Sequence, residues 1–297
     1  MSPTRPTPDG RTAVRPNLTG ELQLDFLDRL RRRDLRVVRV EDVTPRYRRV
    51  VLGGDDLADG FPLVPFAPSD HVKVYFPHPV TGRIVSYRET GDDEWEVDGD
   101  GPPIRRDYTP RAFDPVAREL SLDFVLHDHG VAGRWAARAH VGDPLVVIGP
   151  RANWLLPDDY AHYVAAGDET AIPAISRILE EAPATATVTA LVEVTGAADE
   201  QPIGGTPGRE VRWVHRSTAP VADGHLSALE TAVKGLALPG PLDSVFVFAA
   251  GEAGTIKPIR RYLRRDVGLP TRQLLVDGYW KRGTPDFDHH VVDADEE

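Results

Sequence analysis

The chain has 297 residues, of which 41% are hydrophobic and 27% are charged, and its formal net charge is -11. The length allows two domains of ordinary size, and the composition is that of a soluble globular protein. The acidic balance argues against nucleic-acid binding, because a polyanion is repelled unless a basic stripe compensates. No cysteine occurs, which excludes disulfides, cysteine-ligated iron–sulfur clusters, thiolate zinc sites and a cysteine nucleophile. We therefore expect no metal site, and any redox chemistry needs an organic cofactor.

Both ends are expected to lie outside the folded domains. Residues 1–33 read as a mobile tail followed by a short amphipathic segment at 22–30, with the basic run 29–33 as its solvated end. Residues 284–297 read as an acidic tail. The first residues lack the apolar centre of a secretory signal, and no apolar run reaches the roughly 18 residues of a membrane span. The sequence therefore predicts a cytoplasmic protein with no membrane partner.

The first folded domain, residues 34–152, reads as short strands separated by turns. Six strands are expected, at residues 35–40, 47–52, 71–76, 105–111, 121–126 and 145–148. This number and spacing favour a closed antiparallel barrel. The segment 91–103 is acidic and rich in glycine, so we expect it to be an exposed excursion between strands.

The second domain, residues 153–283, alternates between strand and helix patterns. Its expected strands are 162–166, 187–194, 211–216, 244–250 and 273–276, and its expected helices are 171–181, 224–235 and 256–265. The stretch 245–250 is apolar at every position, which is typical of a parallel strand covered by helices on both faces. The sequence therefore predicts an α/β domain with a parallel sheet, joined to the barrel through residues 149–159.

The hexapeptide at residues 106–111 (RDYTPR) offers three kinds of flavin contact. Arg106 is a cation for a pyrophosphate, Tyr108 an aromatic plate, and Thr109 a hydroxyl for the redox-active nitrogen. Because side chains alternate along a strand, Thr109 and Arg111 are expected to point away from the other pair or to flank the strand end. A strand edge with ordinary surface arginines explains the hexapeptide equally well.

The next strand, residues 123–127 (DFVLH), leads into a helical pattern that starts at Gly130. Backbone amides at a helix start form an anion site suited to a pyrophosphate, and Gly130 and Ala132 put little side-chain bulk in the way. The alternative is that Gly130 only makes a turn, Trp135 only fills the core, and His127 is a structural histidine.

Two segments of the α/β domain follow strands at the edge where parallel sheets bind ligands. They are residues 167–170 (GDET) and the expected turn 251–253 (GEA). Thr170 is expected to cap the following helix, with Pro173 in its first turn, and its hydroxyl also suits contact with the flavin or the nicotinamide. No GxGxxG motif follows the first strand, so the domain is not an ordinary Rossmann dinucleotide binder.

Five blocks, taken in this order, resemble the siderophore-interacting proteins, which are FAD-dependent ferric-siderophore reductases of the ferredoxin–NADP reductase superfamily. The resemblance spans about residues 35–283. The blocks are residues 106–111, residues 123–135, residues 167–174 (GDETAIPA), residues 250–252 ahead of the helix at 260–263, and residues 278–283 (GYWKRG). The chain departs from the family at Val131, where proline is usual.

The resemblance implies an FAD-binding barrel of the ferredoxin reductase type and a nicotinamide-binding α/β domain. It implies electron transfer from NADH or NADPH through FAD to Fe(III) in a ferric siderophore, with release of Fe(II) in the cytoplasm. The candidate FAD residues are Arg106, Tyr108, Thr109, Arg111, Asp123, Val125, His127, Gly130, Ala132, Trp135, Thr170, Tyr279 and Trp280. The candidate nicotinamide residues are Gly167, Asp168, Glu169, Gly251 and Glu252.

The preferred nicotinamide nucleotide stays open at this point. Glu193, near the end of the second α/β strand, suits a ribose 2′-hydroxyl, whereas Arg209, Arg212 and Arg216 suit a 2′-phosphate.

The substrate is expected to be an anionic iron chelate that a monomeric protein attracts with local cations. Lys73, Arg260 and Lys281 are the candidates, and solvated surface charge explains each of them as well. Two other functions remain: a general NAD(P)H–flavin or ferric-chelate reductase without a dedicated siderophore, and a non-catalytic binding protein for siderophore utilisation.

Overall fold

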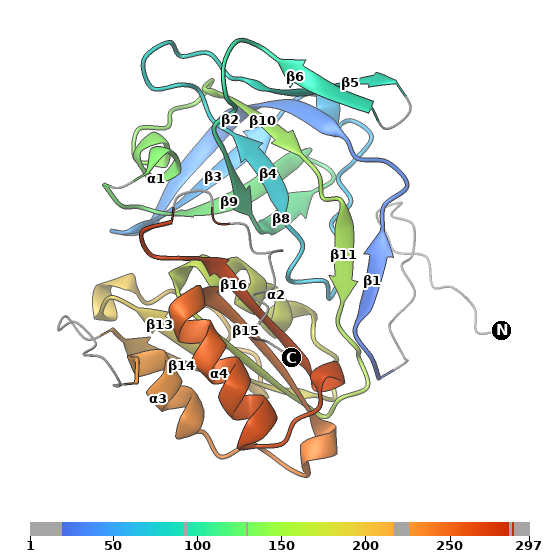
Figure 1. Ribbon diagram of the computed structural model, residues 1–297, viewed down its shortest axis with the longest axis vertical. Coiled ribbons are helices and arrows are strands. Elements are labelled where there is room, and N and C mark those ends of the chain that lie inside the picture. Colours follow the sequence, from blue (N-terminus) through green and yellow to red (C-terminus); the bar gives the residue numbers. More distant parts are fainter. Residues whose placement is uncertain (1–19, 92–93, 129, 217–225, 285–286, 288–297) are drawn as a thin grey trace. The chain divides into compact units, whose positions relative to one another are not determined.

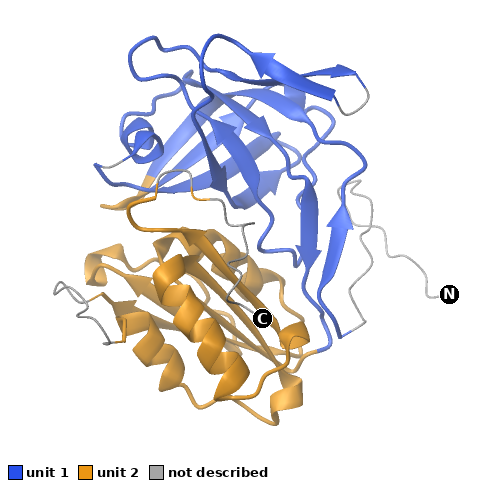
Figure 2. Cartoon of the chain, viewed as in Figure 1, with its two compact units in different colours: residues 1–41, 48–159 blue, residues 42–47, 160–297 orange. Residues whose placement is uncertain are grey.

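The computed structural model describes residues 20–91, 94–128, 130–216, 226–284 and 287. The chain divides into two compact units, of which unit 1 comprises residues 1–41 and 48–159 and unit 2 comprises residues 42–47 and 160–297 (Figure 2). The expected tails lie mostly outside the described residues, as do the first two residues of the helix expected at 224–235. Within the described part of the chain, no helix combines the length and the apolar character needed to cross a membrane.

Unit 1 is built on a curled, seven-stranded antiparallel sheet with the strand order β7-β4-β10-β2-β3-β9-β8 (Figure 1). Its strands are β2 (Arg32–Thr44), β3 (Tyr47–Gly53), β4 (Val72–Tyr75), β7 (Arg105–Tyr108), β8 (Pro110–Asp114), β9 (Glu119–Val125) and β10 (Pro144–Ile148). The helices are η1 (Asp55–Leu57) and α1 (Val131–Ala136). Val50, Leu52, Val74 and Phe124 are among the fully buried side chains of the core that the sheet encloses. Each such side chain contributes about 1.5–3 kcal/mol relative to leaving it exposed.

The sequence predicted six strands in this sheet, and the structure has seven. The segment expected as one strand at 105–111 is divided at Thr109, which is buried, into β7 and β8. The next residue, Pro110, has no amide hydrogen to donate to a sheet ladder. Proline is therefore confined to places such as the first residue of an edge strand, and Pro110 is the first residue of β8. β7 pairs with β4 at one edge of the sheet, and β8 pairs with β9 at the other. The continuous segment 105–114 therefore supplies the strand at each edge of the sheet.

Two small sheets complete unit 1. β1 (Gln23–Phe26) pairs with β11 (Ala152–Leu155), so part of the expected amphipathic segment is a strand. β5 (Ser86–Gly91) pairs with β6 (Glu94–Asp98). The exposed excursion expected at 91–103 therefore contains β6 and the last residue of β5.

The basic run 29–33 is not entirely the solvated end that the sequence predicted. Arg33 belongs to β2 and is 3% exposed. Its guanidinium donates a hydrogen bond of 2.8 Å to the carbonyl oxygen of Gly149 and lies 4.9 Å from the ring centroid of Phe61. Burial lowers the pKa of Arg33 to about 10. This arginine is part of the packing of the barrel.

Unit 2 contains a five-stranded parallel sheet with the order β14-β13-β12-β15-β16, and helices cover it (Figure 1). The strands are β12 (His162–Gly167), β13 (Thr187–Val194), β14 (Arg209–His215), β15 (Val245–Glu252) and β16 (Leu274–Trp280). The helices are η2 (Glu169–Ala171), α2 (Ile172–Glu181), η3 (Ala197–Asp199), α3 (Ala228–Lys234), η4 (Leu242–Ser244), α4 (Ala253–Arg265) and η5 (Thr271–Gln273). The prediction of an α/β domain is confirmed. The strand order reverses between β12 and β15, which is the point where such sheets bind ligands.

Two strands of unit 2 run further than the sequence predicted. β15 continues through Gly251 and Glu252, and α4 starts directly at Ala253, so the expected turn is instead the end of a strand. β16 continues through Tyr279 and Trp280, so this pair also belongs to the sheet and not to a segment after it. Both pairs therefore lie at the carboxyl edge of the parallel sheet.

Candidate functional site

The FAD candidates of unit 1 gather on β7, β8, β9 and α1 around one group of aromatic rings. The ring centroid of Phe124 is 4.4 Å from that of Tyr108 and 5.7 Å from that of Trp135. Phe76 joins the group, with its centroid 5.5 Å from that of Trp135. These rings connect the 106–111 segment with α1. Burial raises the pKa of Tyr108, so its phenol stays protonated and able to donate a hydrogen bond.

The start of α1 is drawn close to the end of β9. Gly130 precedes the helix with φ 78°, in the left-handed region that favours glycine. A Cβ on Gly133 would lie 2.9 Å from the carbonyl oxygen of His127 and 3.0 Å from its Nε2, so only glycine allows this approach. Among the described residues no side chain caps the helix. Its first amides are therefore available to a ligand.

Val131, the departure from the family pattern, is the first residue of α1. Proline is common at this position because its missing amide hydrogen would have no partner within the helix. Valine keeps that amide, so the substitution adds a donor at the helix start. These amides and the half-buried Arg106 and Arg111 are groups of the kind that donate hydrogen bonds to a pyrophosphate.

Asp123 does not offer its carboxylate to a cofactor in this structure. Arg49 on β3 donates two hydrogen bonds to it, of 2.7 Å from Nε and 2.9 Å from Nη2. The Asp123 side chain is fully buried and the Arg49 side chain is 26% exposed. The pair holds β9 to β3, and any part of Asp123 in binding FAD falls to its main chain.

A cavity of about 340 Å³ opens in unit 1. Three aromatic and four basic side chains line it, namely Tyr75, Tyr87, Trp95, His71, Lys73, Arg105 and Arg151. None of the FAD candidates lines it. Of these residues only Lys73 was a candidate from the sequence, although Lys73 and Tyr75 share a strand face and Tyr75 lies opposite Arg105 in the β4–β7 ladder.

The three candidate substrate cations lie in different units, Lys73 in unit 1 and Arg260 and Lys281 in unit 2. Lys73 in unit 1 forms an ion pair with Asp107 at 3.0 Å, across the β4–β7 ladder. In unit 2, Arg260 donates to the carbonyl oxygen of Val276 and lies 3.8 Å from the carboxylate of Asp277. Lys281 is exposed just after β16. Lys73 and Arg260 are thus both engaged with a neighbouring strand.

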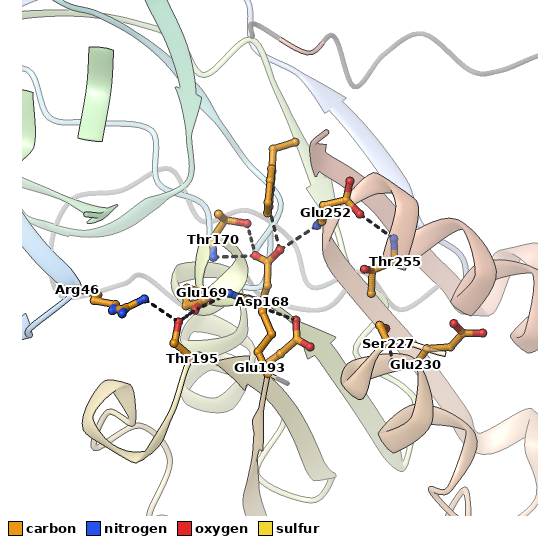
Figure 3. A network of polar contacts seen from close by, with 12 residues as sticks. Arg46, Asp168, Glu169, Thr170, Glu193, Thr195, Ser227, Glu230, Glu252 and Thr255 are labelled. Atoms are coloured by element: carbon orange, nitrogen blue, oxygen red, sulfur yellow. Dashed lines mark hydrogen bonds and ion pairs between the residues drawn. The ribbon is translucent and has the colours of Figure 1, made fainter. Parts of the chain in front are cut away.

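Asp168 is the centre of the polar network in unit 2 (Figure 3). Its Oδ1 accepts hydrogen bonds from the amide and the hydroxyl of Thr170, at 2.9 and 2.5 Å. Its Oδ2 accepts from the amide of Glu252 and from Nε1 of Trp280, both at 2.9 Å. Burial raises the pKa of Asp168, while these hydrogen bonds act in the opposite direction. The carboxylate therefore joins the ends of β12, β15 and β16.

The expectation that Thr170 caps the helix is wrong. Asp168 is the N-cap residue of η2, and Thr170 donates to it. Two glycines make room for this arrangement. A Cβ on Gly167 would lie 2.5 Å from the Cβ of Ala171, and a Cβ on Gly251 would lie 2.7 Å from Oδ2 of Asp168. Pro173 lies in the first turn of α2, as expected.

A second network links Glu169 and Glu193, both labelled in Figure 3, through Arg216. Arg216 donates to Glu169 at 2.6 Å from Nη2 and 3.2 Å from Nη1, and to Glu193 at 3.2 Å from Nε. Burial by itself lowers the pKa of Arg216, but its bonds to Glu169 and the nearby carboxylates raise it overall. Burial raises the pKa of Glu193, and Arg216 lowers it in part.

The two other arginines considered for a 2′-phosphate are used elsewhere. Arg209, the first residue of β14, donates to main-chain carbonyl oxygens at and after the end of α2, including those of Leu179 and Ala182. Arg212 is exposed and pairs with Glu210 at 2.7 Å. Among the described residues, no group of three or more His, Asp or Glu side chains is arranged to hold a metal ion.

A curled antiparallel sheet followed by a parallel sheet with a ligand-binding edge defines the class of ferredoxin-reductase-like flavoproteins, with which the chain shares its fold. Residues 36–154 match the siderophore-interacting FAD-binding domain, and residues 160–283 match the siderophore-interacting protein domain. The chain therefore belongs to the siderophore-interacting protein family, and the resemblance seen in the sequence is confirmed.

Relatives in this family are similar over most of their length. The NADPH-dependent ferric-chelate reductase of Escherichia coli is 35% identical over 84% of this chain and 93% of that protein. The ferric vibriobactin reductase ViuB of Vibrio cholerae is 31% identical over 89% of this chain and 94% of that protein. The solved structure of a siderophore utilization protein from T. fusca superposes with a TM-score of 0.81 at 44% identity, covering 91% of this chain and all of that one.

Proposed function

We propose that this chain is an FAD-dependent reductase that passes electrons from NADH or NADPH to Fe(III) in a ferric siderophore and so releases Fe(II). The observation that carries the proposal is the gathering of the 106–111 segment and the uncapped start of α1 around one aromatic cluster, in a member of this family. The protein works as a monomer in the cytoplasm.

Unit 1 supplies the contacts for FAD. Arg106 and the first amides of α1 would hold the pyrophosphate, together with the residues that end β9. Tyr108 and Thr109 would offer a protonated phenol and a hydroxyl to the ring system, and Arg111 would add positive charge. Bound FAD supplies the conversion between the two-electron chemistry of a hydride donor and the one-electron reduction of Fe(III).

Unit 2 supplies the contacts for the nicotinamide nucleotide. The residues at the carboxyl edge of its sheet, from Gly167 to Thr170 and from Gly251 to Glu252, lie where doubly wound sheets bind nucleotides. Asp168 fixes the indole of Trp280 through its hydrogen bond, so this aromatic side chain has one defined orientation. The task of these residues is to orient the donor and exclude water.

The cavity of unit 1 is the proposed docking place for the ferric siderophore. Its basic side chains attract an anionic chelate, and its aromatic rings offer flat apolar surface to the organic part of the ligand. Siderophores hold Fe(III) with hard oxygen donors, and reduction to the softer Fe(II) weakens the complex. Lys73 is the candidate that lies in this cavity, and Lys281 is retained because it is exposed.

Anaerobic stopped-flow spectroscopy tests the proposal. The purified holoprotein is mixed with NADH or NADPH, and bleaching of the flavin absorbance is followed. The reduced protein is then mixed with catecholate and hydroxamate ferric complexes in the presence of an Fe(II)-specific dye. Bleaching followed by Fe(II) release is the expected result. A colourless protein that does not bind added FAD would contradict it, and equal rates with all simple iron chelates would favour a general ferric-chelate reductase.

A further inference from the structure

We propose that the cluster of Glu169, Arg216 and Glu193 makes unit 2 selective for a nucleotide with a free 2′-hydroxyl, so that NADH is preferred to NADPH. This inference rests on the proposed function, because it concerns the nucleotide that supplies the electrons. Glu193 is its selective residue. The other two members hold Glu193 in place and set the local charge.

The three residues of the cluster lie at the edge of the sheet where nucleotides bind. Glu193 is the last residue but one of β13, Glu169 follows β12 after one residue, and Arg216 directly follows β14. These three strands are neighbours and parallel, so all three residues lie at the same edge of the sheet. In doubly wound sheets that carry the glycine-rich fingerprint, an acidic residue accepts a hydrogen bond from the ribose 2′-hydroxyl of NAD. This domain lacks the fingerprint, but Glu193 offers the same carboxylate at the ligand-binding edge of its sheet.

The hydrogen bonding of Glu193 is the second argument. Its Oε2 accepts from Nε of Arg216, which orients the carboxylate. The described residues provide no hydrogen bond to its Oε1. Glu193 thus combines an anchored oxygen with one that remains able to accept from a hydroxyl.

The charge balance is the third argument. Each of the three guanidinium nitrogens of Arg216 already donates to a carboxylate. Burial raises the pKa of Glu193, and Arg216 lowers it in part. The charges of Asp168 and Glu169 raise this pKa further, so two carboxylates and one arginine act on Glu193. A 2′-phosphate adds up to two further negative charges at this place. This phosphate would stand beside the nearly buried carboxylates of Glu169 and Glu193, and like charges brought together in such a place repel one another strongly.

One further cation lies near the cluster. Arg46 donates to the hydroxyl of Thr195 at 3.3 Å, and this hydroxyl donates to Glu169 at 3.3 Å (Figure 3). Arg46 therefore reaches the cluster through a neutral side chain and forms no ion pair with it. If the protein preferred a 2′-phosphate, Arg46 would be the side chain to supply the positive charge, and Arg46→Ala would abolish that preference.

The test compares two nucleotides that differ only in the 2′-phosphate. The FAD-loaded full chain is titrated calorimetrically with 5′-AMP and with adenosine 2′,5′-bisphosphate. We expect the parent protein to bind 5′-AMP at least tenfold more tightly, and Glu193→Gln to reduce that ratio at least tenfold. The matched control is Glu210→Gln, which removes a carboxylate from another glutamate–arginine pair, near the opposite end of β14, and should leave the ratio unchanged.

Equal or tighter binding of the bisphosphate by the parent protein would overturn the inference, as would an equal effect of Glu193→Gln on both nucleotides. The parent comparison decides even if the variant does not fold. Where the fragments bind too weakly, the rates of flavin bleaching by NADH and NADPH decide in their place. A protein that selects the 2′-hydroxyl but releases no Fe(II) contradicts only the proposed function, whereas one that releases Fe(II) equally with both nucleotides contradicts only this inference.

Discussion

Nε1 of Trp280 donates a hydrogen bond of 2.9 Å to Oδ2 of Asp168, across 112 positions of the sequence. The bond joins the last strand of the parallel sheet to the turn that follows its first strand. Because the carboxylate is buried and accepts three other hydrogen bonds, it holds together the ends of β12, β15 and β16, where the nucleotide is proposed to bind.

Replacing this carboxylate should loosen that edge. In Asp168→Asn, one of the two carboxylate oxygens becomes an NH₂ group, which faces the donors of that oxygen and cannot accept from them, so at least one buried donor loses its partner. We expect the free energy of unfolding to fall by about 1–3 kcal/mol for each lost partner. Urea denaturation measures this loss, and Thr170→Ser, which retains its hydroxyl, is the control. Unchanged stability of Asp168→Asn would contradict the role given to the network.

The loop that is proposed to hold the FAD pyrophosphate depends on Gly133. In Gly133→Ala, the new Cβ meets both the carbonyl oxygen and the ring of His127, so the start of α1 must shift. We expect the purified protein to retain less than half of its FAD, measured as the ratio of absorbance at flavin and protein wavelengths. Circular dichroism should show a folded chain. The exposed Ala137→Ser is the control, and full FAD occupancy of Gly133→Ala would count against this loop as the pyrophosphate site.

The ion pair of Arg49 and Asp123 should stabilise the barrel without taking part in catalysis. Removing the cation in Arg49→Ala leaves a fully buried carboxylate unpaired, which costs about 3–5 kcal/mol. We expect the double variant Arg49→Met with Asp123→Leu to recover most of that loss, because it removes both charges. Chemical denaturation of the three proteins measures the coupling. Equal stability of Arg49→Ala and the parent protein would show that the pair contributes nothing.

Lys73 is expected to act on the iron substrate and not on the nicotinamide nucleotide. We expect Lys73→Ala to raise the KM for an anionic ferric siderophore about fivefold, which corresponds to about 1 kcal/mol for a partly exposed charged contact. NADH oxidation with a neutral small acceptor should not change. Lys234→Ala is the control, because Lys234 pairs with Glu230 within a helix of unit 2. Equal kinetics of Lys73→Ala and the parent protein with both acceptors would remove Lys73 from the docking site.

Protonation of Glu193 should contribute to the pH dependence of the free energy of unfolding. Its pKa in the folded protein lies above its ordinary value of 4.5, so the folded chain binds this proton more tightly than the unfolded chain. Its contribution to stability is therefore complete below pH 4.5 and declines as the pH rises through the folded pKa. Relative to the parent protein, Glu193→Gln should become more stable as the pH rises over that window.

Glu210 provides a control of opposite sign for this experiment. Its hydrogen bond with Arg212 lowers the pKa of Glu210, so its contribution is present above 4.5 and is lost as the pH falls. Denaturation curves of both variants at several pH values measure the two slopes. Slopes of the same sign would contradict the assignment.

The sequence was sufficient for the class and order of the domains. The fully apolar stretch 245–250 predicted a strand buried on both faces, and every residue of it is buried. Such patterns are local, because the periodicity of apolar residues states which faces of an element are covered. The family could also be recognised from the sequence, because each of its five blocks is a short run of consecutive residues.

Only the tertiary structure decided how single side chains are used. Thr170 is a residue type that caps helices, yet the N-cap residue is Asp168. The carboxylate of Asp168 also accepts hydrogen bonds from the amide of Glu252 and from Nε1 of Trp280. The sequence suggested Arg216 as a cation for a 2′-phosphate, whereas in the structure it forms ion pairs with Glu169 and Glu193.

The residues that line the cavity of unit 1 are also brought together only by the tertiary structure. Register between strands brings Lys73 opposite Asp107 and Tyr75 opposite Arg105, and no local pattern states which strands will pair. Hydrogen bonds and ion pairs join residues that are distant in the chain, so their partners are settled by strand order and register, which the sequence of any single element does not contain.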